Sequence, residues 1–137
     1  MKKYYSYLDT GMVQHVPQPL QHQTIHALAA RLDGVIQFYY MEEFRTLKSQ
    51  KLLRSKIPMM QSADGIIFFS IQQFCYGKSI NVTLMSQILD LGLELHFVKE
   101  NISLLDKENF SKALDFLLVV DHTIRNGPTF ISRSLPS

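Results

Sequence analysis

The sequence predicts an α/β protein with a mostly parallel sheet of four to five strands flanked by helices. Short apolar runs alternate along the chain with longer segments in which apolar residues recur at helical spacing. One run, Ile66-Ile67-Phe68-Phe69, is an uninterrupted apolar stretch, which is typical of a parallel strand covered on both faces. Strands that alternate with helices favour parallel pairing, because each helix carries the chain back across the sheet.

Composition agrees with a single globular domain. The chain has 137 residues and 46% of them are hydrophobic, which is enough to bury a sizeable core. The formal net charge of +2 is too small to indicate nucleic-acid binding by itself. The single cysteine, Cys75, excludes an internal disulfide and favours a reducing, cytoplasmic location. Because no apolar run approaches the roughly 20 residues of a membrane span, we expect no membrane contact.

Four apolar runs are the predicted strands. They combine β-branched, aromatic and leucine residues and are separated from one another by helical segments. Their ranges are Lys3 to Leu8, Val35 to Tyr39, Gly65 to Phe69, and Leu93 to Val98.

Four further segments are the predicted helices, each with one apolar stripe. Asp33-Gly34 ends the first, Pro58 the second and Gly92 the third, and Asp106 is the expected N-cap of the fourth. The segments are Pro19 to Leu32, Phe44 to Ile57, Ser79 to Leu91, and one that begins near Lys107. The stripes are Leu20, Ile25, Leu28 and Leu32; Leu47, Leu52, Leu53 and Ile57; Ile80, Leu84, Ile88 and Leu91; and Phe110, Leu114, Leu117 and Leu118.

The predicted domain covers residues 1–125. From Asn126 the chain contains Gly127, Pro128 and several serines, so we expect residues 126–137 to form an irregular C-terminal tail.

The order and spacing of these elements resemble the catalytic domain of the serine recombinases (the resolvase/invertase family) over about Tyr4 to Arg125. In the strongest piece, Gly65 to Gly92, the family has an apolar strand, Leu-Asp-Arg-Leu, a short Gly/Arg/Ser stretch, an amphipathic helix and a glycine. Val98-Lys99-Glu100-Asn101-Ile102 resembles the family's Thr-Glu-Asn-Ile segment. The resemblance implies a resolvase-like fold, a role in DNA recombination, and a long dimerisation helix that begins near Asn109.

The family's catalytic residues do not carry over to this chain. Tyr7 and Asp9 stand where the family's Tyr-x-Arg-Val-Ser motif places its catalytic arginine and serine. Gln72 and Gln73 replace the Asp-Arg pair, and Tyr76 replaces a further arginine. Serine-mediated strand cleavage needs a hydroxyl nucleophile and guanidinium groups around the charge that develops on phosphorus. The sequence therefore predicts a pseudoenzyme, a recombinase fold that acts as a binding or regulatory protein.

Two surfaces are candidates for binding. The segment Asn109 to Arg125 is the expected interface with a second copy or another protein, through Phe110, Leu114, Leu117 and Val120 if the core leaves them exposed. The second surface is one basic cluster, which either contacts DNA nonspecifically or is a solvated helix face. Its members are Arg45, Lys48, Lys51, Arg54 and Lys56.

Other readings of the sequence remain open. An active strand transferase would need a displaced nucleophile, for which Ser6 and Thr10 are the candidates. A small-ligand pocket would use Gln72, Gln73 and Tyr76 as hydrogen-bonding groups.

One pair of residues has metal-ligand spacing. His22 and His26 lie four residues apart on the first predicted helix, and His15 and Cys75 are possible additional ligands. Without a supporting carboxylate we interpret the pair as part of a polar helix face, and we expect no metal and no cofactor.

Overall fold

The structure is a computed structural model that describes residues 1–76 and 79–119. These residues form one five-stranded sheet in the order β2-β1-β3-β4-β5. Strands β1 to β4 are parallel, and β5 pairs antiparallel with β4. The predicted α/β class and mostly parallel sheet are confirmed. The strands are β1 Lys2–Asp9, β2 Gly34–Glu42, β3 Gly65–Phe68, β4 Glu94–Phe97 and β5 Ile102–Leu104.

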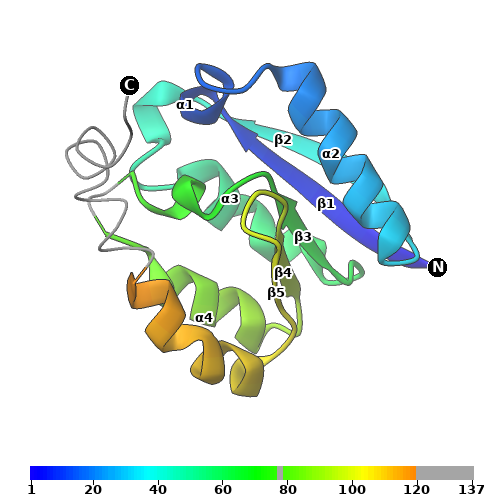
Figure 1. The fold of residues 1–137 in the computed structure, drawn as a ribbon, viewed down its shortest axis with the longest axis vertical. Helices are drawn as coiled ribbons and strands as arrows, with labels where there is room; N and C mark the ends of the chain where they lie inside the picture. Colours follow the sequence, from blue (N-terminus) through cyan, green and yellow to red (C-terminus); the bar gives the residue numbers. More distant parts are fainter. Residues whose placement is uncertain (77–78, 120–137) are drawn as a thin grey trace, which may run out of the picture.

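The helices lie in two layers on the two sides of the sheet (Figure 1). Helix α2, Gln18–Arg31, covers one side, where Ile25 and Leu28 pack against Tyr4, Leu8 and Ile67. The other side carries a larger core that includes residues of α3 Lys51–Lys56, α4 Val82–Asp90 and the helix at residues 107–119.

Alternation along β1 decides which of its side chains face each core. Tyr4 and Leu8 belong to the core under α2, whereas Tyr5 and Tyr7 belong to the larger core on the opposite side. Asp9, two residues after Tyr7, follows it onto the side of the larger core. Asp9 is also the N-cap of the short helix α1, Thr10–Val13, which begins where β1 ends.

Three predicted helix boundaries are confirmed. Gly92 has a φ of +82° and its N–H donates to the Leu89 carbonyl, which ends α4. Asp106 caps the helix at residues 107–119 because its Oδ1 accepts from the Asn109 N–H at 2.8 Å. The turn after α2 occurs at Asp33, which has a φ of +60°.

The prediction of one helix from Phe44 to Ile57 was wrong. The segment is broken into the 3₁₀ turn η1 Phe44–Thr46, helix α3, and the 3₁₀ turn η2 Ile57–Met60. The break lies at Gln50, whose left-handed backbone (φ 50°) separates η1 from α3. A helical stripe of leucines in the sequence does not reveal a left-handed residue between two turns.

Three stripe positions were also wrong, because Leu20, Leu91 and Leu118 are exposed. At the start of α2, Gln21 is buried and the neighbouring Leu20 is exposed. The Gln21 Nε2 donates to the Val16 carbonyl at 3.0 Å. Leu91 lies beyond the last turn of α4 as its C-cap residue.

Val120 and the predicted tail from Asn126 lie outside the described residues. No helix within the described ranges is long and apolar enough to cross a membrane.

Candidate functional site

Residues that the sequence resemblance assigns to catalytic positions lie at the carboxyl ends of β1 and β3. Tyr7 and Asp9 come from the end of β1. Gln73 belongs to the 3₁₀ turn η3, Ile71–Phe74, that follows β3, and Tyr76 comes shortly after it. Because parallel strands end at the same edge of the sheet, these distant segments converge there. The structure brings together Tyr7, Asp9, Gln73 and Tyr76 through the contacts described below, whereas Gln72 contacts Ser70 through its backbone.

Asp9 is completely buried and holds Tyr76 over the start of α1. Its Oδ1 accepts from the Met12 N–H at 2.7 Å and from the Tyr76 hydroxyl at 2.9 Å. Burial raises the pKa of Asp9, against the lowering effect of these hydrogen bonds. A Cβ added to Gly11 would lie 2.9 Å from the Tyr76 hydroxyl, so the phenol ring fills the space directly beside α1 at this residue.

A second buried carboxylate, Glu42, lies beside Asp9 in the strand register and was not anticipated from the sequence. Its Oε1 accepts from the Tyr7 hydroxyl at 2.8 Å and from the Leu53 N–H at 3.2 Å. Its Oε2 accepts from the Leu52 N–H at 2.9 Å and from the Thr46 hydroxyl. Glu42 thus supplies the acceptors for the first turn of α3, a role that favours a carboxylate.

Tyr7 and Tyr76 are each tied to one of these carboxylates. Burial, followed by the hydrogen bond to Glu42, raises the pKa of Tyr7. Burial, followed by the neighbouring Asp9 charge, raises the pKa of Tyr76. Both phenols therefore stay neutral and act as hydrogen-bond donors inside the site.

Gln73 uses both ends of its amide inside the protein. Its Oε1 accepts from the Ser70 N–H at 3.0 Å, and its Nε2 donates to the Tyr7 carbonyl at 3.2 Å. The first contact is half of a capping box with Ser70, which fixes η3. Gln72 is half-buried, and its N–H donates to the Ser70 hydroxyl at 3.1 Å. The amide of Gln73 is therefore occupied in placing the turn.

The hydroxyls of Ser6 and Thr10, the two candidate displaced nucleophiles, are both buried but lie in different places. Ser6 points to the opposite side of the sheet from Tyr7, because neighbouring strand residues alternate. Thr10 lies in the first turn of α1, next to Asp9. Neither hydroxyl has a hydrogen-bond partner among the described residues.

The predicted basic cluster does not converge on one point. Lys48 lines a hollow of about 480 Å³ beside the start of α4, whereas Lys51 lines a different hollow beside Glu42 and Glu43. The Nε of Arg54 donates to the Ser49 carbonyl, and Lys56 lies 5.8 Å from the centre of the Tyr40 ring. Arg45 is exposed in η1.

Among the described residues the arginines are Arg31, Arg45 and Arg54, and all are exposed. None of the contacts described for Asp9, Glu42, Gln73 and Tyr76 involves one of them. Arg125 and Arg133 lie outside the described residues.

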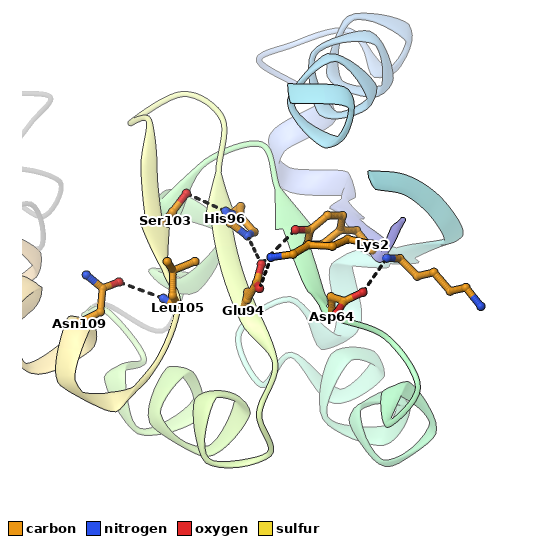
Figure 2. A network of polar contacts seen from close by, with 9 residues as sticks. Lys2, Asp64, Glu94, His96, Ser103, Leu105 and Asn109 are labelled. Atoms are coloured by element: carbon orange, nitrogen blue, oxygen red, sulfur yellow. Dashed lines mark hydrogen bonds and ion pairs between the residues drawn. The ribbon is translucent and has the colours of Figure 1, made fainter. Parts of the chain in front are cut away.

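A separate polar network lies at the other end of the strands (Figure 2). Glu94 at the start of β4 accepts from Lys2 at 2.9 Å, from the Tyr4 hydroxyl at 3.0 Å and from the His96 Nε2 at 2.8 Å. The other ring nitrogen of His96 lies 2.7 Å from the Ser103 hydroxyl on β5. Burial lowers the pKa of His96, against the raising effect of Glu94. This network joins β1, β4 and the edge strand β5.

Comparison with solved structures gives a match over nearly the whole chain. A solved structure described as the crystal structure of a resolvase family site-specific recombinase from Streptococcus pneumoniae is similar to this chain, with a TM-score of 0.63 and 18% sequence identity. The match covers 98% of this chain and 99% of that one. No family model matches the sequence, and no curated protein matches it. This chain has a resolvase-like fold.

At this identity the similarity extends to the fold alone, because unrelated functions share folds. The sheet order, the helices on both faces and the turn after β3 fix where the site residues lie. The chemistry of the site depends on the side chains that this chain places there.

Proposed function

We propose that the chain is a resolvase-like domain without strand-transfer activity, and that it acts by binding a second copy of itself. The lack of strand-transfer activity is supported by the hydrogen bonds that pair Tyr7 with Glu42 and Tyr76 with Asp9. These pairs occupy the space at the strand ends where the resemblance implies arginines and a nucleophilic serine. Two buried carboxylates replace the positive charge that a phosphoryl group requires.

The electrostatics of the site oppose phosphodiester cleavage. Negative charge develops on the phosphoryl oxygens in the transition state, and removing a single donor typically slows such a reaction by about 10² to 10³. Several donors are replaced here, and Asp9 would repel the phosphate from the nucleophile position. The phenols of Tyr7 and Tyr76 already donate to carboxylates, so their hydrogens are not directed at a substrate.

The binding half of the proposal rests on the helix at residues 107–119. Its inward stripe, Phe110 and Leu117, is buried in the larger core, so these residues are not available to a partner. Phe116 and Val119, one helical turn apart, are 51% and 62% exposed. Exposed aromatic and aliphatic side chains of this kind supply the buried centre of protein interfaces. Within the expected Asn109 to Arg125 interface, the contact therefore uses the outward side of the helix.

Nonspecific DNA contact by the basic cluster is the lesser part of the proposal. Lys48 and Lys51 line separate hollows, and Arg54 and Lys56 have partners within the protein. Such a divided cluster predicts weak binding that decreases further with salt, because it depends on the release of counterions.

The mass of the chain in solution over a concentration series tests the binding proposal. We expect a dimer that Phe116→Glu and Val119→Glu convert to a monomer, because each places a charge at the centre of the contact. Gln23→Glu is the matched control, since it adds the same charge to an exposed position on α2. A monomer at all concentrations, or a dimer unaffected by both helix variants, contradicts the proposed interface. Salt-dependent DNA binding measured in parallel tests the basic cluster separately.

A further inference from the structure

A surface hollow on the α2 side of the sheet gathers metal-ligating side chains. Gln18, His22 and His26 follow one another at intervals of four residues along α2, so they lie on one stripe of the helix. Tyr39 of the edge strand β2 lies against both imidazoles, with ring centres 5.1 Å from His22 and 5.6 Å from His26. These four residues line a hollow of about 440 Å³ together with Leu8, Tyr40 and Met41.

Both imidazoles have a polar partner at Nε2 within the hollow. The Gln18 Nε2 lies 3.3 Å from the Nε2 of His22, and an amide nitrogen can only donate, so His22 Nε2 is the acceptor. The Tyr39 hydroxyl is hydrogen-bonded to the Nε2 of His26, and a phenol that donates there makes this nitrogen an acceptor too. The Nε2 atoms of both rings therefore lie beside polar side chains that line the hollow. A neutral imidazole with a free lone pair on Nε2 is the form of histidine that binds metals.

In place of the expectation from the sequence that no metal binds, we propose that the Nε2 atoms of His22 and His26 and the phenol oxygen of Tyr39 bind a divalent transition-metal ion. Two histidines four residues apart on a helix chelate one ion from the same face, as in helical zinc sites. The Tyr39 oxygen is placed as the third ligand, since it already contacts His26 Nε2, and on binding it releases its proton to solvent.

The chemistry of the donors selects the ion. Imidazole suits Cu²⁺, Ni²⁺ and Zn²⁺, whereas Ca²⁺ and Mg²⁺ need several carboxylate or carbonyl oxygens. The described residues group no three His, Cys, Asp or Glu side chains that could hold a metal, so the phenol is essential to a three-ligand site. Cys75 takes no part, because it packs against the core on the opposite side of the sheet from α2. We expect Cu²⁺ to bind more tightly than Zn²⁺.

Titration of the full chain with Cu²⁺ and with Zn²⁺, followed by calorimetry, tests the site. His22→Ala and His26→Ala should each weaken binding by on the order of tenfold or more, since even losing a group that supports a ligand costs this much. The control is His15→Ala, which removes an exposed histidine that does not line the hollow and should leave the affinity unchanged. Circular dichroism checks that each variant is folded.

The absorption of the Cu²⁺ complex tests the third ligand. Tyr39→Phe should abolish the phenolate-to-copper charge-transfer band while leaving two-histidine binding measurable. The proposal is overturned if Cu²⁺ produces no binding heat, or if the His22 and His26 variants bind as tightly as the unmodified chain. An unchanged absorption spectrum in Tyr39→Phe overturns the assignment of the phenol.

Discussion

Tyr76 and Asp9, 67 positions apart in the sequence, are joined by a hydrogen bond of 2.9 Å that crosses the carboxyl ends of β1 and β3. This contact places a neutral phenol and a buried carboxylate at the carboxyl ends of the strands, at positions that the sequence resemblance assigns to catalysis. The same carboxylate caps α1 through the Met12 N–H, so the site and the local backbone depend on one side chain.

Asp9 should give the chain a characteristic dependence of stability on pH. Burial raises the pKa of Asp9 above its ordinary value of 3.8 in the folded state. Because the folded pKa is raised, the stabilising contribution of protonated Asp9 is complete below pH 3.8 and is lost as pH rises through the folded pKa. We therefore expect the free energy of unfolding to fall as pH rises from 3.8 through the folded pKa of Asp9. The Asp9→Asn variant should not show this fall, because asparagine does not titrate.

Urea unfolding at a series of pH values measures this difference. Asp115→Asn, which changes an exposed aspartate on the helix at residues 107–119, is the matched control and should reproduce the unmodified curve. Parallel pH curves for the unmodified chain and Asp9→Asn would show that Asp9 titrates alike in both states.

Substitution of Glu42 should destabilise the fold strongly. It accepts from the Tyr7 hydroxyl, the Thr46 hydroxyl and the N–H groups of Leu52 and Leu53. Glu42→Gln replaces one acceptor oxygen with an NH₂ group that faces buried donors, and each donor left unpaired costs about 1–3 kcal/mol. We predict that Glu42→Gln lowers the free energy of unfolding by about 2 kcal/mol or more. Its exposed neighbour supplies the control, Glu43→Gln, and equal stability of the two variants would contradict the role of Glu42.

His96 should destabilise the fold in mild acid. Burial lowers its pKa from the ordinary value of 6.5, so the unfolded chain takes up a proton before the folded chain does. The free energy of unfolding should therefore fall as pH drops below about 6.5, until the folded pKa is reached.

His96→Gln removes this titration, and His15→Gln controls for an exposed histidine. A second loss at lower pH is expected from Glu94. Although burial alone would raise the pKa of Glu94, hydrogen bonds from His96, Lys2 and Tyr4 lower it below 4.5. A difference curve between the unmodified chain and His96→Gln that stays flat near pH 6 would refute the His96 prediction.

The fold could be predicted because its signals are local. Continuous apolar strands and the helix signals at Asp33-Gly34, Gly92 and Asp106 each act within a few residues, and the structure confirms them. The three-residue strand β5 and the left-handed Gln50 were not located, because neither has a periodic pattern of its own.

The candidate site was predicted only in part. Tyr7, Asp9, Gln73 and Tyr76 were found through the resemblance, and their convergence follows from parallel strands. Glu42 was missed because a glutamate at the end of a strand looks like a surface residue in the sequence. Its burial depends on the Tyr7 hydroxyl and on the start of α3, contacts between segments that no local pattern encodes.

The central claim, a recombinase fold without strand-transfer chemistry, is tested most directly by trapping covalent protein–DNA complexes. The chain would be incubated with a pool of random-sequence duplexes, so that no target site needs to be known, and then denatured. DNA that remains attached to protein would be amplified and counted. We predict recovery equal to that from a variant carrying both Ser6→Ala and Thr10→Ala. Recovery above that variant, with enrichment of particular sequences, would show an active displaced nucleophile and contradict the account.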